Sequence, residues 1–284
     1  MNLYYNCDSI AKIEYKGNSI RCEIDQYFLD GIHHKSDEEG KRCKPEPKDI
    51  CDCYEEIKTN SNKRTTKEKK ALSKLVISNN RNQDSNWFCI DVEYVKPFDN
   101  QAEKDKAGFS GRFDIIALSK EQPHRVALIK LKYGSGAIGG KSGIREIIKD
   151  FSKFREKKVY ETYLKEEIIE ITKSLHDLGV SLPFEFPLSE SKLLSASPEF
   201  YVITLNNNAE KAGESAPKQI MAGYLFKDKR WGCRELSSNH CVEKEFGDVT
   251  KKGNGLYVTF LFSTETVENV AINDIIDDER YERP

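Results

Sequence analysis

The sequence has no hydrophobic run that approaches the roughly 20 residues a membrane-spanning helix needs. Hydrophobic residues make up 38% of the 284 positions and charged residues 32%, with a mean hydropathy of −0.66. The first twelve residues, MNLYYNCDSIAK, lack the basic start and apolar middle of a signal peptide. We therefore expect a cytoplasmic protein without a membrane partner.

Paired cysteine knuckles of the C-x2-C type are also missing, although the chain has eight cysteines. The densest group is Cys43, Cys51 and Cys53, with His33 and His34 upstream. This spacing does not match familiar zinc sites, so a zinc cluster remains a minor alternative. A chain of this length does not need disulfides, and we expect free thiols in a reducing compartment.

A strong net charge is absent, because 45 basic residues nearly balance 47 acidic ones. The distribution is uneven, however. Residues 120–158 contain eleven basic and four acidic residues, whereas residues 265–284 contain seven acidic residues and two arginines. A locally basic face on a neutral protein can follow phosphates, or it can be an ordinary solvated surface. Charge alone does not decide between the two.

A nucleotide-binding loop is not evident either. The glycine-rich stretch 134–143, GSGAIGGKSG, follows a predicted strand. It matches neither G-x4-G-K-[ST] nor a G-x-G-x-x-G motif that is followed by a ribose-binding acid. We interpret it as a flexible connection that leaves a sheet close to a ligand.

Three apolar, β-branched segments stand out in the middle of the chain. The segments Phe88–Val95, Arg112–Leu118 and Arg125–Tyr133 each read as a buried strand. Side chains alternate along a strand, so the first segment places Asp91 and Glu93 on one face. These segments form the centre of the predicted sheet.

Three further charged residues lie inside the same segments. Asp114 comes near the start of the second segment, and Lys130 and Lys132 share one face of the third. Burying such groups is costly unless a metal, a partner or a substrate needs them, which indicates a functional site. The alternative is a structural role: Asp114 caps a turn or pairs with Arg112 of its own segment, and the two lysines pair with Asp91 and Glu93 across the strands.

Helices are predicted on both sides of these strands in the chain. One begins near Thr66, and another, from residue 144, has an apolar stripe and a basic face. The second helix is followed by another that ends at Gly179, a typical helix C-cap. The remaining predicted strands are residues 10–15, 19–25, 199–205, 219–226 and 256–263.

The predicted order around the site is helix, three strands, helix, strand. We expect an α/β (α+β) fold with an αβββαβ core, a mixed central sheet flanked by helices, and extra N- and C-terminal strands. The expected parts are an N-terminal hairpin with a polar insertion (1–65), the core (66–210), and C-terminal strands with an acidic tail (211–284). We expect these parts to pack as one compact domain.

This order resembles the core of the PD-(D/E)XK nuclease superfamily, the restriction-endonuclease-like fold, as it occurs in uncharacterised bacterial proteins. The resemblance covers about half of the chain, residues 66–206, and its motif is short and degenerate. Asp114 in GRFDIIAL matches the first half of the motif, Lys132 in IKLKYG matches the final lysine, and Glu93 or Asp91 matches an additional upstream acid.

The resemblance implies Mg²⁺- or Mn²⁺-dependent hydrolysis of a phosphodiester in nucleic acid, most simply DNA. Asp114 and Glu93, with Asp91, would hold the metal, and Lys132 would stabilise the charge that develops on the phosphate. The basic side chains expected to contact nucleic acid are those of Lys141, Arg145, Lys149 and Lys153. The alternative is a binding or scaffolding protein that keeps the nuclease fold without catalysis.

One position departs from the family. The motif has an acid or glutamine two residues before the final lysine, and this chain has Lys130 there. Three interpretations stay open: a degenerate site, a local variant or engineered inactivation, or a carboxylate that has moved to the following helix. Glu146, about fourteen residues after Lys132, is the candidate in the last case, as in some restriction endonucleases.

Overall fold

The computed structural model describes residues 2–30, 42–96, 103, 111–134, 144–189, 198–206, 239–246, 256–263, 266–268 and 270–273. The chain divides into two compact units, residues 1–74 and 75–284. The boundary falls inside helix α4 (Lys67–Arg81), whose first turns belong to the first unit and whose last turns belong to the second.

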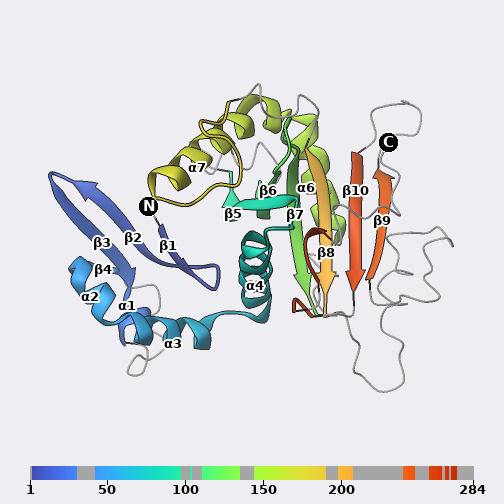
Figure 1. Cartoon of the computed structure of the whole chain (residues 1–284). Helices are drawn as coiled ribbons and strands as arrows, with labels where there is room; N and C mark the ends of the chain where they lie inside the picture. Colours follow the sequence, from blue (N-terminus) through green and yellow to red (C-terminus); the bar gives the residue numbers. More distant parts are fainter. Residues whose placement is uncertain are drawn as a thin grey trace, which may run out of the picture. The chain divides into compact units, whose positions relative to one another are not determined.

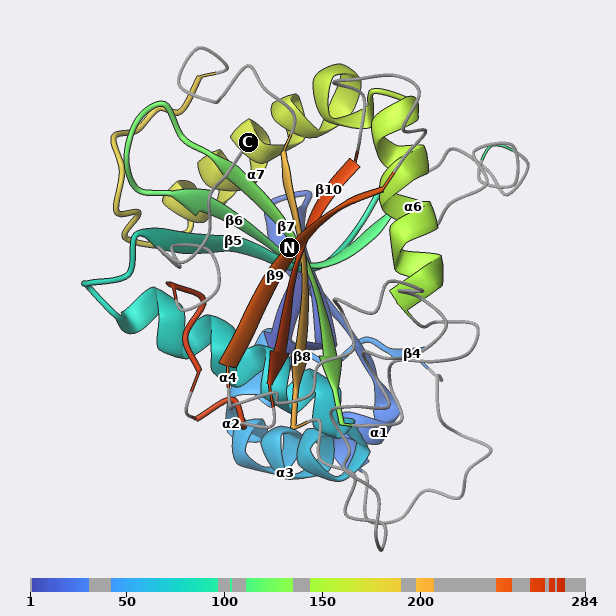
Figure 2. The ribbon, with the colours of Figure 1, turned by 90° about the vertical axis from the view of Figure 1, so that its right-hand side faces the viewer.

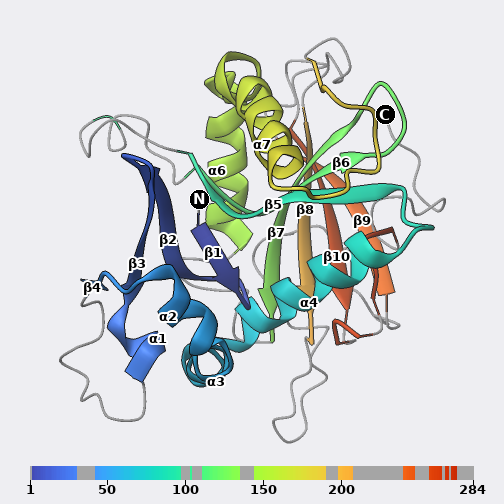
Figure 3. The same cartoon turned by 60° about the vertical axis from the view of Figure 1, so that its left-hand side comes forward.

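The first unit is a small antiparallel sheet with helices beside it (Figure 3). Its strands pair in the order β1-β2-β3-β4. Its elements are β1 (Asn2–Tyr5), β2 (Asp8–Lys16), β3 (Ser19–Asp25), β4 (Arg42–Cys43), α1 (Gln26–Asp30), α2 (Pro47–Asp52) and α3 (Tyr54–Arg64). The predicted hairpin between β2 and β3 is confirmed, and its turn residues Gly17 and Asn18 have φ of +59° and +61°. Glycine and asparagine are the residues that best tolerate this conformation.

Polar contacts tie the helices of the first unit to its strands. The Arg64 guanidinium donates to Asp25 at 2.9 Å, and the Asp8 carboxylate accepts from the Thr65 hydroxyl at 2.6 Å. The core between these elements contains Ile10, Ala11, Cys22, Ile24, Phe28, Ile50 and Ile57. The first unit therefore has a hydrophobic core of its own.

The second unit is built on a mixed six-stranded sheet of order β5-β6-β7-β8-β10-β9 (Figures 1 and 2). Its strands are β5 (Trp87–Val95), β6 (Arg112–Ser119), β7 (Val126–Tyr133), β8 (Glu199–Leu205), β9 (Asn239–Phe246) and β10 (Leu256–Ser263). β5, β6 and β7 are antiparallel neighbours, β8 runs parallel to β7, and β10 runs parallel to β8. A parallel pair needs a crossover connection, and helices lie in the connection between β7 and β8.

The crossover between β7 and β8 contains α6 (Ile144–Glu156), a π-helical turn (Tyr160–Leu164) and α7 (Lys165–Asp177). The predicted apolar stripe on α6 is confirmed for Ile147, Phe151 and Phe154, which are all buried. After α7, the amide of Gly179 donates to the carbonyl of His176, and Gly179 has φ of +78°. The predicted glycine C-cap is therefore present.

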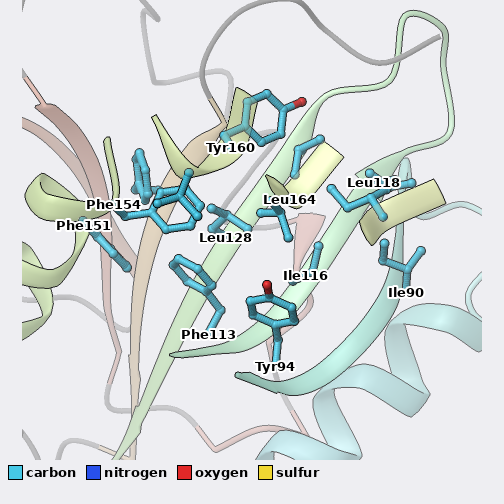
Figure 4. Close-up of a cluster of buried hydrophobic side chains, with 14 of the residues drawn as sticks. Ile90, Tyr94, Phe113, Ile116, Leu118, Leu128, Phe151, Phe154, Tyr160 and Leu164 are labelled. Atoms are coloured by element: carbon cyan, nitrogen blue, oxygen red, sulfur yellow. The ribbon is translucent and has the colours of Figure 1, made fainter. Parts of the chain in front are cut away.

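The hydrophobic core of the second unit lies between the sheet and these helices (Figure 4). The Phe113 ring stacks on the Phe151 ring at a centroid distance of 5.9 Å and meets the Phe154 ring edge-on at 5.1 Å. The residues Tyr94, Ile116, Leu128, Tyr160 and Leu164 extend the same cluster. The other face of the central strands is buried too, as Ile115 and Ile129 show.

The mixed α/β class expected from the sequence is confirmed. Each of the three central strands was placed to within one residue at each end, and the strands at 199–205 and 256–263 match β8 and β10. The strand expected at 219–226 lies outside the described residues. Strands β1, β4 and β9, helix α1 and the π-helical turn were not predicted.

Side chains of α4 protect β5, the edge strand of the second sheet. The Asn80 side chain accepts from the amide of Cys89 and donates to its carbonyl, both at 2.8 Å. It thus satisfies the two backbone groups that a neighbouring strand would otherwise bind. The Asn79 amide group donates to the carbonyl of Trp87 at 2.9 Å.

The six cysteines whose side chains the structure describes are free thiols: Cys7, Cys22, Cys43, Cys51, Cys53 and Cys89. Burial raises the pKa of the Cys89 thiol, which the Asn79 hydrogen bond opposes only in part. No helix in the described part of the chain is long and apolar enough to cross a membrane.

Candidate nucleic-acid interface on strands β5, β6 and β7

Three of the predicted site residues form one row across the sheet. The register pairs Val92 with Ile115 and Tyr94 with Phe113, which places Glu93 opposite Asp114. The last pair recorded between β6 and β7 is Ile115 with Ile129, so Lys130 lies opposite Asp114 one position further on. The row therefore runs from Glu93 through Asp114 to Lys130.

Asp114 has both carboxylate oxygens engaged by β7. The Lys130 ammonium donates to Oδ1 at 2.9 Å, and the backbone amide of Leu131 donates to Oδ2 at 2.7 Å. The side chains of Lys130 and Asp114 are only 15% and 17% exposed. Removing one partner of such a partly buried, hydrogen-bonded ion pair is costly, because the other charge is then left without a partner. The expected alternative pairing of Asp114 with Arg112 is not the one that forms.

Glu93 is held by a different cation. The Arg112 guanidinium donates to Glu93 Oε2 at 3.3 Å. The backbone of Glu93 has φ of +56°, which is unusual for a residue other than glycine. Strain of this kind persists only when the surrounding structure enforces it. The pairing of Glu93 with a lysine of β7, one of the alternatives from the sequence, is not present.

Asp91 and Glu93 contact different partners, although both belong to β5. The ladder between β5 and β6 shifts register between Cys89 and Asp91, which marks a β-bulge. The Asp91 carboxylate accepts a hydrogen bond from the backbone amide of Val92 at 2.9 Å. Burial raises the pKa of Asp91 to about 6, with a smaller contribution from the negative charge of Glu167, while the Val92 hydrogen bond opposes the rise.

Among the described residues of the row and its neighbours on β7, Lys132 is the cation that is not paired with a carboxylate. It is half-buried, lies two residues beyond Lys130 on the same face of β7, and is opposite Thr204 of β8. Within the ranges that the structure describes, its ammonium has no ionic partner. An ammonium group in this position can donate hydrogen bonds to a phosphate oxygen.

The other predicted residues lie on or before α6. Glu146 pairs with Lys149 at 2.7 Å on the same helix, and both side chains are well exposed. The Glu146 side chain therefore contacts its own helix, and no contact between Glu146 and Asp114 is present among the described residues. Lys153 is half-buried on α6. Lys141 and the side chain of Arg145 lie outside the described residues.

The side chains of the row do not suit a divalent metal ion. Mg²⁺ and Mn²⁺ prefer several free oxygen ligands, and here Asp114 is neutralised by Lys130 and Glu93 by Arg112. No group of three or more histidine, cysteine or acidic side chains with metal-binding geometry exists among the residues described. This statement includes Cys43, Cys51 and Cys53, whereas His33 and His34 lie outside the described residues.

A second polar cluster, between β5 and α7, was not predicted from the sequence. The Tyr94 hydroxyl donates to Glu167 Oε2, and Tyr163 is a further hydrogen-bond partner of the same carboxylate. The Lys96 ammonium lies 4.6 Å from the centre of the Tyr163 ring. The spacing of Tyr163 and Glu167, four residues apart on one helical face, was the available signal in the sequence.

We compared the chain with family models, with curated proteins and with solved structures. None of the three comparisons gives a match.

Proposed function

We propose that this chain has a PD-(D/E)XK-like nuclease core that binds nucleic acid without cleaving it, because Lys130 takes the position of the catalytic metal. The single observation that carries this proposal is the contact of 2.9 Å between Lys130 Nζ and Asp114 Oδ1. The strand directions support the core assignment. Strands β5 to β8 pair as antiparallel, antiparallel and parallel neighbours, with α6 and α7 before β8.

Electrostatics favours binding without metal chemistry. A divalent ion about 4 Å from an ammonium group is repelled by about 8 kcal/mol at an effective dielectric constant of about 20. A millimolar dissociation constant corresponds to only about 4 kcal/mol of binding free energy. The repulsion thus exceeds what a weak metal site provides.

The same charges leave the site attractive to an anion. Glu93 and Asp114 are balanced by Arg112 and Lys130, and Lys132 adds one further positive charge to this set. The exposed Lys149 of α6 belongs to the basic stretch 120–158. Phosphate contacts of this kind give affinity that is independent of sequence and falls steeply with salt.

The test uses fluorescently labelled duplex DNA and RNA of the same sequence. Their binding is measured by fluorescence anisotropy at low salt in the presence of EDTA. We expect binding that weakens as salt rises, and a loss of about tenfold for Lys132→Ala. Lys173→Ala is the matched control, since Lys173 is exposed on α7, and it should bind like the unmodified protein.

Two outcomes overturn the proposal in different ways. If neither nucleic acid binds, or if Lys132→Ala binds as well as the control, the interface is wrong. If the unmodified protein cleaves nucleic acid only when Mg²⁺ or Mn²⁺ is added, and Asp114→Ala abolishes cleavage, the chain is an active nuclease and Lys130 does not block the site.

A further inference from the structure

A group of lysines lies in the first unit where helix α3 leads into helix α4 (Figure 1). Residues 62–74, from the end of α3 into α4, contain six basic residues and one acidic residue. The backbone of Thr65, between the two helices, is extended, with φ of −66° and ψ of 134°. The Lys70 ammonium of α4 donates to the carbonyl of Asn62 in α3 at 2.8 Å. Lys70 therefore lies beside the last turn of α3, which carries Lys63.

Two of the six basic residues bind carboxylates of the small sheet. Arg64 pairs with Asp25 of β3 at 2.9 Å, and Lys69 pairs with Asp8 of β2 at 2.5 Å. These two positive charges are balanced within the first unit, and they attach α3 and α4 to its strands.

Three of the other lysines have no carboxylate as a partner among the described residues. Lys63 and Lys70 donate to uncharged oxygens, Oδ1 of Asn60 at 3.4 Å and the carbonyl oxygen of Asn62. The exposed Lys67 side chain has neither an ion pair nor a hydrogen bond within the described ranges. Three positive charges at the junction of α3 and α4 are therefore left unbalanced.

Helical spacing places the lysines of α4 on one face. Lys67, Lys70 and Lys74 are three and four residues apart, so their side chains follow one another along the same side of the helix. Glu68 shares a face with the buried Leu72, four residues later, and lies away from this row. At a rise of about 1.5 Å per residue, the row is about 10 Å long. One strand of a DNA duplex advances about 3.4 Å per nucleotide, so about three phosphates fit this length.

We propose that the first unit binds the phosphate backbone of duplex DNA through a lysine face that consists of Lys63, Lys67, Lys70 and Lys74. Nucleic acid as the class of partner rests on the proposed function, which gives the first unit no role. The position of the lysine face does not depend on strands β5, β6 and β7. Phosphate contacts from lysine side chains position a protein on a duplex without reading its sequence.

The composition of this face favours nucleic acid over a membrane surface. Helices that bind anionic membranes insert exposed apolar side chains between the lipids. The structure describes residues 62–74 in full, and their apolar residues, Ala71 and Leu72, are both buried. The lysine face therefore offers charge without an apolar surface that could enter a bilayer.

The test measures how binding of a fluorescently labelled DNA duplex to the full chain weakens as salt rises, by anisotropy in the presence of EDTA. Each phosphate contact adds about 0.9 to the slope of the logarithm of the binding constant against the logarithm of salt concentration. We expect this slope to become shallower by about 2 to 3 in the triple variant Lys63→Ala, Lys67→Ala, Lys70→Ala.

The matched control is the triple variant Lys16→Ala, Lys44→Ala, Lys48→Ala. It removes the same charge from exposed positions elsewhere in the first unit and should keep the slope of the unmodified protein. If the control makes the slope shallower by as much as the lysine-face variant does, binding depends only on net charge and the proposal is overturned.

The single variant Lys67→Ala covers the case in which the triple variant does not fold, because the Lys67 side chain has no contact to lose in the described part of the chain. The slope should become shallower by about 1. An unchanged slope for Lys67→Ala contradicts the proposal.

The outcomes separate the lysine face from the interface on β5, β6 and β7. If the lysine-face variant keeps the full slope while Lys132→Ala loses affinity, the lysine face is wrong and the proposed function stands. If the lysine-face variant loses slope while Lys132→Ala binds normally, the reverse holds. If the unmodified protein binds RNA but no duplex DNA, only the lysine face is overturned, and if it binds neither, both proposals are.

Discussion

Lys130 and Asp114 face each other across β7 and β6, with Lys130 Nζ 2.9 Å from Asp114 Oδ1. The next amide along β7, that of Leu131, donates to the other oxygen of the same carboxylate at 2.7 Å. The contact begins where the recorded ladder between the two strands ends, after the pair Ile115 and Ile129. Both oxygens of Asp114 are thus engaged, one by an ammonium group and one by a backbone amide, and under the proposed nuclease assignment the ammonium lies where a metal ion would bind.

The first prediction concerns metal binding. Lys130→Glu replaces the cation beside Asp114 with a second carboxylate, which restores the acid of the motif. We expect calorimetry to detect Mn²⁺ binding with a millimolar or tighter dissociation constant, where the unmodified protein shows none. Lys130→Gln is the control, since it removes the positive charge and adds no carboxylate. A folded Lys130→Glu protein that binds no Mn²⁺ would show that the register assigned to the motif is wrong.

The second prediction concerns the ion pair between Arg125, which directly precedes β7, and Glu199 of β8. The Arg125 guanidinium donates to both oxygens of Glu199 at 2.6 and 2.8 Å, and it lies 4.8 Å from the centre of the Trp87 ring. Lysine cannot reproduce the two-pronged hydrogen bond or the stacking. We expect Arg125→Lys to lower the free energy of unfolding in urea by about 1–3 kcal/mol.

The control for this pair is Lys157→Arg, a substitution of the same two residue types at an exposed position. Its unfolding free energy should stay within about 0.5 kcal/mol of the unmodified protein. An Arg125→Lys protein as stable as this control would mean that the paired hydrogen bonds to Glu199 and the contact with the Trp87 ring add nothing measurable to the free energy of unfolding.

The third prediction concerns the protected edge of the sheet. Asn80→Ala removes both hydrogen bonds to the backbone of Cys89 and leaves that amide and carbonyl without their partner. We expect a loss of about 1–3 kcal/mol and faster hydrogen exchange at the Cys89 amide. Arg81→Ala, at the exposed last residue of α4, is the comparison. Unchanged exchange at Cys89 in Asn80→Ala would contradict the assigned role.

The fourth prediction is a pH dependence from Asp91. Its pKa of about 6 in the folded protein is above the ordinary aspartate value of about 3.9, so the folded state binds this proton more tightly. The stability linked to Asp91 is therefore greatest below about pH 4 and decreases as pH rises through 6. Above pH 6 the loss reaches up to about 3 kcal/mol.

Asp91→Asn keeps the acceptor for the Val92 amide and cannot ionise. In urea at pH 8 it should be more stable than the unmodified protein by about 1–3 kcal/mol, and near pH 4 the two should agree. Asp84→Asn, at an exposed position, is the control and should not change stability at either pH. If Asp91→Asn were less stable than the unmodified protein at pH 8, the charge of Asp91 would stabilise the folded state, contrary to this prediction.

Much of the core of the second unit could be predicted from the sequence. The apolar segments at Phe88, Arg112 and Arg125 match β5, β6 and β7, because alternation of side chains along a strand is a local property. The charged positions within them, such as Asp114 and Lys130, were visible for the same reason. The unit boundary inside α4 was not visible, since a helix that continues through the boundary gives no change of composition.

The partners of the charged residues were decided by the tertiary structure. The sequence allowed Asp114 to pair with Arg112 and Lys130 to pair with an acid of β5, and the register across β6 and β7 joins Asp114 to Lys130 instead. Asp91 and Glu93 also contact different groups, because Asp91 accepts a hydrogen bond from the Val92 amide and Glu93 pairs with Arg112. The sequence by itself determined which residues carry charge into the strands. Only the pairing of strands distant in the chain determined which charges meet, because register and bulges depend on contacts that no single segment contains.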